Sequence, residues 1–337
     1  MTGRYRILVV GPSWVGDMVM AQSLFMALKQ QHKNCLIDVL APEWSLAILD
    51  RMPEVRKAIV MPLGHGQFDF KGRKEIGKTL QSEQYDEAVV LPNSWKSALV
   101  PYFAKIPKRT GYLGEMRWGL LNNARKLDKL FLTKTVQRFV ALATDPSAIL
   151  PIIPQPRLLI DPASVEMAKQ QFAISPIESK VLGLCPGAEY GPAKRWPEEH
   201  YADVAKLALE KGWQVYLFGS VKDQVVTAKI NQLAGGDCYD FAGKTNLTEA
   251  LDLMSLCNVI VSNDSGLMHV AAALNIKTIA IYGSSDPAFT PPLHPAAEVI
   301  SLGLSCSPCF KRECPLGHLD CLVNISAASV NKLIFNS

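Results

Sequence analysis

The amino-acid sequence predicts an α/β protein with two similar domains, each built on a parallel sheet. Three observations lead to this prediction. In both halves of the chain, short apolar runs alternate with stretches of helical periodicity, which is typical of parallel strands joined by helices. A proline-rich stretch over residues 146–162 lies between the halves. The length of 337 residues suits two domains, because a domain commonly holds about 150 residues.

In the first half, the run Arg6–Val10 predicts a buried strand, residues 11–17 a turn that contains glycine, and Met18–Lys29 an amphipathic helix. The basic stretch Lys108–Arg125 contains three glycines, so part of it is expected to be a loop. The other expected strands of this half are 36–40, 58–61 and 87–91, and the other expected helices are 44–49, 74–81 and 94–102.

The second half repeats the alternation. Val259–Asn263 is a β-branched run that predicts a strand, and a polar hinge follows it before a helix that reaches Leu274. The other expected strands are 181–185, 214–218 and 278–282, and the other expected helices are 198–211 and 248–257. Because prolines disfavour regular structure, we expect a first domain over 1–155, a linker over 156–178 and a second domain over 179–337. Ligands of such proteins bind at the carboxyl ends of the strands, in the cleft between the domains.

Composition argues against two classes of protein. No apolar run reaches the length of about 18 residues that a membrane-spanning helix needs. The start of the chain runs straight into a strand, so no secretory signal is expected. Four cysteines are scattered through strand-like and helical stretches, as in a reduced cytosolic protein. They are Cys35, Cys185, Cys238 and Cys257.

Charge is distributed unevenly along the chain. Residues 1–155 hold 21 Lys and Arg against 13 Asp and Glu, a net charge of +8, whereas the remainder holds 14 against 18, a net charge of −4. A basic half suggests an anionic partner, which could be nucleic acid, a phosphorylated molecule or a membrane surface. The alternative is a solvated surface without a partner. The aromatic residues near these charges look scattered in the sequence, which disfavours a stacking platform for nucleic acid. They are Trp95, Tyr102, Tyr112 and Trp118.

The hinge after Asn263 is a candidate anion site. A helix N-terminus offers unpaired N–H groups and a partial positive charge, which favour an anion such as a diphosphate. Asp264 or Ser265 can cap the helix, Gly266 permits close approach of a ligand to the backbone, and His269 lies about one turn further along. The alternative is an ordinary capped helix with a buried histidine.

Two further residues could carry chemistry. Asp17 follows the first strand, where a carboxylate can accept a proton from a bound hydroxyl, but the same position also suits the N-cap of the next helix. Lys194 lies in a loop rich in Gly and Pro after a strand, where a positive charge suits phosphate. Tyr190 and Lys194 have the Tyr-x-x-x-Lys spacing of short-chain dehydrogenases, but Gly191 and Pro192 disfavour the helix that this pair needs.

Four cysteines near the C-terminus, Cys306, Cys309, Cys314 and Cys321, could supply the ligands of a structural zinc ion, and His318 lies among them. The second pair is not a tight Cys-x-x-Cys, so a loop of free thiols is the alternative. Nothing in the sequence places an acid–base residue beside these thiols, and we therefore expect no catalytic metal there.

Four motifs together resemble the lipopolysaccharide heptosyltransferases over nearly the whole chain. They are GPSWVGDM at 11–18, NSWKSA at 93–98, PGAEYGPAKRWP at 186–197 and SNDSGLMHVAAAL at 262–274. The resemblance implies a GT-B fold, in which two Rossmann-like domains face each other across a cleft. It implies an inverting transfer of L-glycero-D-manno-heptose from ADP-heptose to the first heptose of the lipopolysaccharide inner core. It also implies heptosyl-Kdo2-lipid A as acceptor, the cytoplasmic face of the inner membrane as location, no nucleic-acid partner and no essential cofactor.

The resemblance further implies roles for individual residues. Asp17 corresponds to the proposed general base. We expect Lys96 and Arg117 of the basic half to hold the acidic acceptor. The residues expected to hold ADP-heptose are Gly187, Ala188, Glu189, Lys194, Ser220, Asp264, Ser265, Gly266 and His269. Because donor specificity depends on pocket shape, another GT-B nucleotide-sugar glycosyltransferase, an epimerase or a non-enzymatic anion-binding module stays an alternative.

Overall fold

The structure, a computed structural model, describes residues 4–63, 67–145 and 149–335. The chain forms two compact units, Met1–Pro156 and Arg157–Ser337. The first three residues and residues 146–148 of the proline-rich stretch lie outside the described ranges. None of the helices within those ranges is both long and apolar enough to span a membrane.

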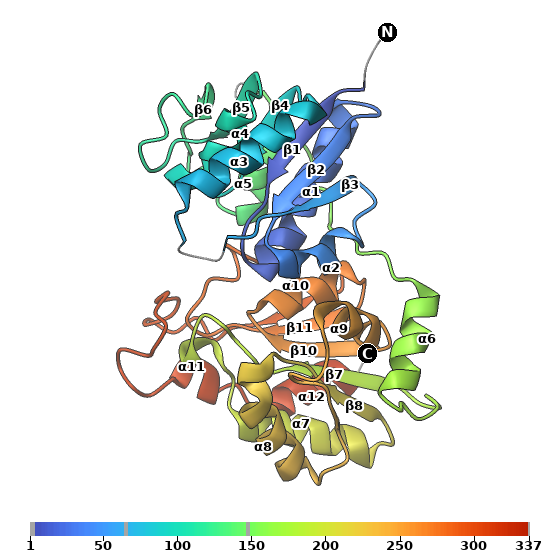
Figure 1. Cartoon of the computed structure of the whole chain (residues 1–337). Helices are drawn as coiled ribbons and strands as arrows, with labels where there is room; N and C mark the ends of the chain where they lie inside the picture. The colour runs from blue at the N-terminus through green and yellow to red at the C-terminus, as the bar shows by residue number, and fades with distance from the viewer. Residues whose placement is uncertain (1–3, 64–66, 146–148, 336–337) are drawn as a thin grey trace. The chain divides into compact units, whose positions relative to one another are not determined.

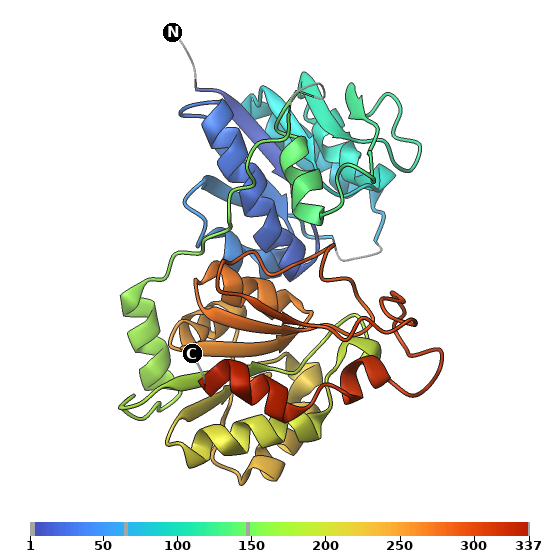
Figure 2. The same cartoon turned by 180° about the vertical axis from the view of Figure 1, so that it is seen from behind.

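Unit 1 contains a six-stranded sheet in which each strand runs parallel to its neighbours, in the order β3-β2-β1-β4-β5-β6. Figure 1 shows α3 and α4 on one face of this sheet, and Figure 2 shows α1 and α5 on the other. The strands are β1 (Arg6–Val10), β2 (Leu36–Ala41), β3 (Val55–Val60), β4 (Glu87–Val90), β5 (Lys108–Tyr112) and β6 (Asn123–Arg125). The helices are α1 (Val15–Gln31), α2 (Leu46–Leu49), α3 (Phe70–Leu80), α4 (Leu99–Phe103) and α5 (Thr135–Ala141), with 3-10 turns η1 (Glu43–Ser45), η2 (Gln81–Glu83) and η3 (Trp95–Ala98).

Unit 2 contains a second six-stranded parallel sheet, in the order β12-β11-β10-β7-β8-β9. Helices α7 and α12 cover one face, seen in Figure 2, and α9 and α10 lie on the other, seen in Figure 1. The strands are β7 (Val181–Cys185), β8 (Gln214–Leu217), β9 (Tyr239–Asp240), β10 (Val259–Asn263), β11 (Lys277–Ile281) and β12 (Glu298–Ile300). The helices are α6 (Pro162–Gln171), α7 (Glu198–Glu210), α8 (Gln224–Ala234), α9 (Leu247–Met254), α10 (Gly266–Ala273), α11 (Asp320–Val323) and α12 (Ala327–Phe335), with 3-10 turns η4 (Pro192–Lys194) and η5 (Val221–Asp223).

The two sheets have the same topology. In each of them the first and fourth strands of the unit lie side by side at the centre, β1 beside β4 and β7 beside β10, and the strand order reverses between them. This order is that of a Rossmann-like sheet, and ligands bind such sheets outside the carboxyl ends of the two central strands. The predicted α/β class is confirmed. The topology predicts that ligands bind near the loops that follow β1, β7 and β10.

Helix α1 is not amphipathic, contrary to the prediction. It begins at Val15 rather than Met18, and every residue from Met18 to Phe25 is buried, which covers all sides of the helix. The reason is that α1 packs against the sheet on one side and against its neighbour α5 on another, so two of its faces are covered (Figure 2). The two polar residues in this run are satisfied, since Gln22 donates to Glu54 at 3.0 Å and Ser23 donates to a backbone carbonyl at 2.6 Å.

The basic stretch Lys108–Arg125, expected to be partly loop, contributes both β5 and β6 to the sheet. The two strands were not predicted, because the glycines of this stretch are typical of loops. Gly111 lies within β5, where a Cβ atom would come within 3.1 Å of the Val90 carbonyl oxygen, so a glycine fits this close approach to β4.

The segment 156–178, expected to be a linker, contains helix α6, whose first residue is Pro162. Asp161 caps this helix by accepting from the N–H of Ala163 at 3.0 Å. Helix α6 packs against α9, where the Gln171 amide donates to Glu249 at 3.0 Å. The segment is therefore part of the second unit.

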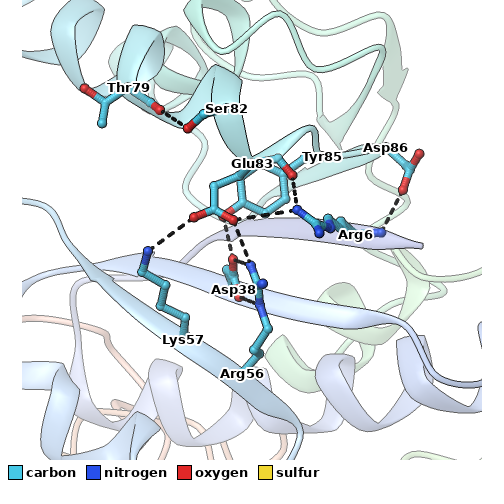
Figure 3. A network of polar contacts seen from close by, with 9 residues as sticks. All are labelled: Arg6, Asp38, Arg56, Lys57, Thr79, Ser82, Glu83, Tyr85 and Asp86. Atoms are coloured by element: carbon cyan, nitrogen blue, oxygen red, sulfur yellow. Dashed lines mark hydrogen bonds and ion pairs between the residues drawn. The ribbon is translucent and has the colours of Figure 1, made fainter. Parts of the chain in front are cut away.

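A buried carboxylate joins the outer strands of the first sheet. Asp38 on β2 is fully buried and accepts from Arg56 of β3, with Nε at 2.8 Å, and from the Tyr85 hydroxyl at 2.6 Å (Figure 3). Glu83 lies further out and accepts from Arg56 at 3.2 Å and from Lys57 at 3.3 Å. The hydrogen bond to Asp38 raises the pKa of Arg56, and Arg56 lowers the pKa of Glu83. The network ties β2 and β3 to the segment Glu83–Tyr85, which leads into β4.

The network predicts unequal effects of two substitutions. Asp38→Ala should lower the free energy of unfolding by about 3–5 kcal/mol, because it leaves Arg56 and Tyr85 without their buried acceptor. Glu83→Gln should cost less than about 1 kcal/mol, because that pair is exposed to solvent screening. Urea unfolding of both variants measures the difference, and equal losses would contradict the central role of Asp38.

Candidate functional site

The residues predicted to hold an anion gather at the carboxyl ends of β7, β8 and β10, where the topology of unit 2 places a ligand site. They fall into two neighbouring groups. One group surrounds the turn between β10 and α10, and the other surrounds the turn after β8. The loop that follows β7 runs past both.

Asn263, the last residue of β10, is a fully buried hydrogen-bond hub. Its Oδ1 accepts from the backbone N–H of Trp196 at 3.0 Å and from the Tyr201 hydroxyl at 3.0 Å. Its Nδ2 donates to the backbone carbonyl of Pro186 at 2.6 Å. The amide thereby fixes both ends of the loop after β7, whose residues 187–195 form the outer part of the site.

Lys194 and Asp264 form a largely buried ion pair. The Lys194 Nζ lies 2.5 Å from Asp264 Oδ2, and the two side chains are 17% and 5% exposed. Lys194 belongs to the short 3-10 turn η4, and its ammonium also lies 5.1 Å from the centre of the Tyr190 ring. The structure thus brings together two residues that are 70 positions apart in the sequence, in a position to present a positive charge to an anion.

His269 lies on α10, three residues after Gly266, and is buried. Burial lowers its pKa to about 4, the charge of Asp264 acts in the opposite direction, and the charge of Lys194 lowers the pKa further. The imidazole is therefore neutral at pH 7 and can offer one donor and one acceptor, not a positive charge.

The N-terminus of α10 has no side-chain cap. Ser265 occupies the N-cap position, but its hydroxyl makes no capping bond and lies 3.2 Å from the Ser262 hydroxyl instead. Asp264, the other predicted cap, is paired with Lys194. The prediction of a capped helix is therefore wrong. The N–H groups of the first turn, beginning at Gly266, keep the capacity to bind an anion.

The second group is organised by Asp223, which the sequence analysis did not identify. Its carboxylate accepts from the backbone N–H of Ser220 at 2.9 Å and from the Ser220 hydroxyl at 2.7 Å. Arg195 lies 3.8 Å from the same carboxylate. A Cβ atom at Gly187 would come within 2.6 Å of Asp223, so only glycine permits this approach. The Ser-x-x-Asp spacing directly after a strand was the signal that could have revealed Asp223.

The remaining predicted donor residues differ in their surroundings. Ala188 is buried, and its carbonyl oxygen lies 3.5 Å from a guanidinium nitrogen of Arg195. Glu189 is exposed and pairs with Lys222 at 2.5 Å. Ala188 therefore belongs to the wall of the loop, whereas Glu189 lies on its outer side.

The cysteine-rich segment is attached to the Lys194 turn. The backbone N–H of Ala193 donates to the Arg312 carbonyl at 3.0 Å, and the Tyr190 hydroxyl donates to the Phe310 carbonyl at 2.8 Å. A Cβ atom at Gly191 would come within 2.5 Å of the same Arg312 oxygen. The Arg312 guanidinium lies 5.2 Å from the centre of the Tyr190 ring, so Lys194 and Arg312 share one aromatic neighbour. These contacts were not predicted, because they join loops far apart in the sequence.

The four C-terminal cysteines lie close enough for their thiols to interact. Burial raises the pKa of Cys321, and the thiols of Cys306, Cys309 and Cys314 raise it further. All four are free thiols. Within the described part of the chain, no three His, Cys, Asp or Glu side chains are placed to hold a metal ion.

In unit 1, Asp17 is not an N-cap. Trp14 occupies the N-cap position of α1, and Asp17 lies in the first helical turn, half-buried. A carboxylate there interacts favourably with the helix dipole. Asp17 also follows β1, one of the two central strands at which the order of this sheet reverses.

Arg117 cannot hold a ligand in the predicted way. Its side chain is 1% exposed, and its guanidinium donates to the carbonyl of Pro92 at 2.7 Å, to the carbonyl of Tyr112 and to Asn93 Oδ1 at 3.3 Å. The prediction failed because an arginine in a glycine-rich stretch resembles an exposed residue, whereas here it fastens that stretch to the end of β4. Lys96 is half-buried, and its Nζ lies 3.3 Å from the Gln67 carbonyl.

Ser284 and Ser285, which follow β11, were not predicted as site residues from the sequence. Both are buried, and neither hydroxyl has a hydrogen-bond partner in the ranges that the structure describes. The backbone N–H of Ser284 donates to the Ala193 carbonyl at 3.3 Å, which places this turn beside Lys194.

Known proteins resemble this chain along nearly its whole length. The sequence model of glycosyltransferase family 9 (heptosyltransferase) matches residues 73–320. Lipopolysaccharide heptosyltransferase 2 of Escherichia coli strain K12 is 47% identical over 335 residues, covering 96% of either chain. Lipooligosaccharide heptosyltransferase 2 of Haemophilus influenzae is 49% identical over 308 residues, covering 88% of either chain.

A solved structure agrees with these matches. The structure of E. coli ADP-heptose lipopolysaccharide heptosyltransferase II matches with a TM-score of 0.86 and 44% identity, covering 98% of this chain and 97% of that one. The match confirms the GT-B fold class that the motifs implied.

The low pKa of His269 predicts a defined dependence of stability on pH. Between about pH 6.5 and pH 4, the unfolded chain binds a proton at this histidine that the folded chain does not bind. The free energy of unfolding should therefore fall as the pH is lowered through that window, by about 3 kcal/mol in total. Urea unfolding at several pH values should show a weaker decline for His269→Gln. His318→Gln, at an exposed position, serves as control, and identical slopes for H269Q and the parent protein would refute the assignment.

Proposed function

This chain belongs to glycosyltransferase family 9, the heptosyltransferases, and we propose that it transfers L-glycero-D-manno-heptose from ADP-heptose to the first heptose of the lipopolysaccharide inner core. The relatives with about half of their residues identical are named heptosyltransferase 2, which supports this acceptor. The proposal assigns the donor to unit 2 and the acceptor and the general base to unit 1.

The observation that carries the donor assignment is the Lys194–Asp264 pair at the uncapped N-terminus of α10. A diphosphate needs a cation and several N–H donors in one place, and this turn supplies both. Neutral His269 and the Gly266 backbone complete the same group. Gly187, Ala188 and Ser220, arranged around Asp223, form the adjoining wall for the nucleoside part, while Glu189 lies at its rim.

In the proposed reaction, an acceptor hydroxyl oxygen attacks the anomeric carbon of the heptose from the face opposite ADP. The bond between that carbon and the β-phosphate oxygen breaks, and the configuration inverts. The Asp17 carboxylate takes the proton of the hydroxyl. The negative charge that develops on ADP is stabilised by Lys194 and the α10 N-terminus. The transition state has oxocarbenium character, as in glycoside hydrolysis.

The acceptor carries Kdo carboxylates and lipid A phosphates, so it requires cations on unit 1. Lys96 suits this role, because its ammonium is accessible and no carboxylate of the described residues pairs with it. Arg117 supports Lys96 indirectly, by holding the Pro92 carbonyl and thus the segment on which Lys96 lies. Because this acceptor is anchored in a lipid bilayer, we place the enzyme at the cytoplasmic surface of the inner membrane.

Asp17→Asn tests the general base. The substitution keeps the shape of the side chain and removes its basicity, so kcat for ADP release with a heptose-bearing acceptor should fall about 100-fold or more. The affinity for ADP-heptose should not change, because unit 2 holds the donor. Asp50→Asn, an exposed aspartate in the same unit, is the matched control. Retention of more than half of the activity would leave Asp17 with the role of stabilising the helix dipole only.

Lys194→Ala tests the donor site. Loss of the cation should raise the KM for ADP-heptose and lower kcat together, since Lys194 acts on the bound diphosphate and on the leaving group. Lys206→Ala removes an exposed lysine of α7 in the same unit and should leave both constants unchanged. Unchanged values of KM and kcat in K194A would show that Lys194 does not act on the donor.

A further inference from the structure

A basic and aromatic surface on unit 1 is not used by the proposed reaction. It comprises the exposed side of α3 and the end of α4, and we call it the α3 surface. Five rings, those of Trp95, Phe68, Phe70, Phe103 and Tyr102, contact each other in sequence along it. Its cations are Lys71, Lys74, Lys78, Lys105 and Arg109. Figure 1 shows α3 and α4 side by side on one face of the unit.

The five rings form one continuous row. The centres of Trp95 and Phe68 are 5.6 Å apart, and those of Phe68 and Phe70 are 6.2 Å apart. Phe103 lies 5.4 Å from Phe70 and 5.4 Å from Tyr102. Phe68, Phe70 and Tyr102 are each more than 40% exposed, which is unusual for aromatic residues that lie together on one surface.

Lysines flank the row on one side of α3. Lys71, Lys74 and Lys78 follow the spacing that places residues on a single helix face, and all three are exposed. Glu75 is the one carboxylate of this helix, so the face is strongly basic. The Lys74 ammonium lies 5.9 Å from the centre of the Phe103 ring, which joins the lysine stripe to the aromatic row.

The row ends at a basic pocket of about 440 Å³. Lys78, Lys105 and Arg109 line this pocket together with Tyr102 and Phe103. Arg109 is held in place because Nε donates to the Leu120 carbonyl at 2.6 Å and NH1 donates to the Ile106 carbonyl at 2.6 Å. A pocket with three cations and an aromatic wall suits a phosphate-bearing headgroup.

The other end of the row lies beside Lys96. The buried Arg73 donates from Nε to the Phe68 carbonyl at 2.7 Å and from NH1 to the Lys96 carbonyl at 3.4 Å. One buried guanidinium therefore holds the start of the row and the lysine proposed for the acceptor in a fixed relation.

We propose that the α3 surface docks on an anionic lipid bilayer, with the rings at headgroup depth and the lysines against the lipid phosphates. Exposed aromatic rings flanked by lysines are the composition of membrane-interface surfaces. Nucleic acid is the less suitable partner, because base stacking needs free ring faces. Phe103 meets both of its ring neighbours at steep angles of 86° and 77°, and cations lie over Phe103 and Tyr102. The docking itself does not depend on the proposed function. One consequence rests on it, namely that docking brings Lys96 close to a lipid-linked acceptor.

Vesicle flotation tests the docking without any substrate. The full chain is mixed with phosphatidylcholine vesicles that contain about one third phosphatidylglycerol, or none, and lysine substitutions are compared. The native protein should float with the anionic vesicles only, and the triple variant K71Q/K74Q/K78Q should bind them about 10- to 100-fold less well. Tyr102→Ser should weaken the same binding without changing the charge. The triple variant K33Q/K206Q/K244Q, which removes three other exposed lysines, should bind as the native protein does.

Several outcomes would overturn the proposal. These are native binding in K71Q/K74Q/K78Q, equal binding to neutral vesicles, or loss of binding in the control triple variant. A labelled single-stranded RNA that binds through the same lysines, without vesicle binding, would assign the surface to nucleic acid instead. In a separate assay, K71Q/K74Q/K78Q should transfer heptose to a lipid-free, water-soluble acceptor at the native rate. A failed transferase assay would count against the proposed function and leave the flotation result standing.

Discussion

The donor side of this protein depends on one buried amide, that of Asn263. A fully buried side-chain amide is stable only when its donor and acceptor groups are both used. Asn263 uses them on Pro186 and Trp196, at the two ends of the loop after β7, and on Tyr201 of α7. The loop is therefore not free to move as a whole relative to β10. Because the Lys194–Asp264 pair joins this loop to the residue after Asn263, the amide also determines where the positive charge is presented.

The two units use buried charge in different ways. In unit 1, Asp38 lies inside the sheet and is surrounded by Arg56 and Tyr85, so the pair has only a structural role. In unit 2, Lys194 and Asp264 lie at the end of the sheet, beside helix N–H groups that have no side-chain cap. Paired charged groups thus stabilise the fold in unit 1 and belong to the proposed donor site in unit 2. Their position relative to the strand ends decides between the two roles.

Pattern analysis identified the central strands and the polar turn after β10, because these parts obey local rules. Strands such as Arg6–Val10 and Val259–Asn263 are buried on both faces and therefore appear as continuous apolar runs. Pattern analysis failed where tertiary contacts override local signals. Helix α1 is covered on two sides. Arg117 is buried by carbonyl groups of β5 and of the segment after β4, and the aromatic row joins residues that look scattered in sequence. Asp223 and the contact between Arg312 and Ala193 could not be seen, because both depend on loops that meet only in the folded unit.

In the proposed donor site, the internal pairing of Lys194 also bears on how ADP is released. An incoming diphosphate must attract Lys194 away from Asp264, which is a stronger competitor than water. The attraction between Lys194 and Asp264 is therefore lost again each time ADP is bound, and it is regained each time ADP leaves. An unpaired lysine in the same place would hold ADP more tightly and would slow the next cycle. In the proposed reaction, Asp264 is thus an internal counter-ion that limits inhibition by ADP, while Lys194 stays available for the charge of the transition state.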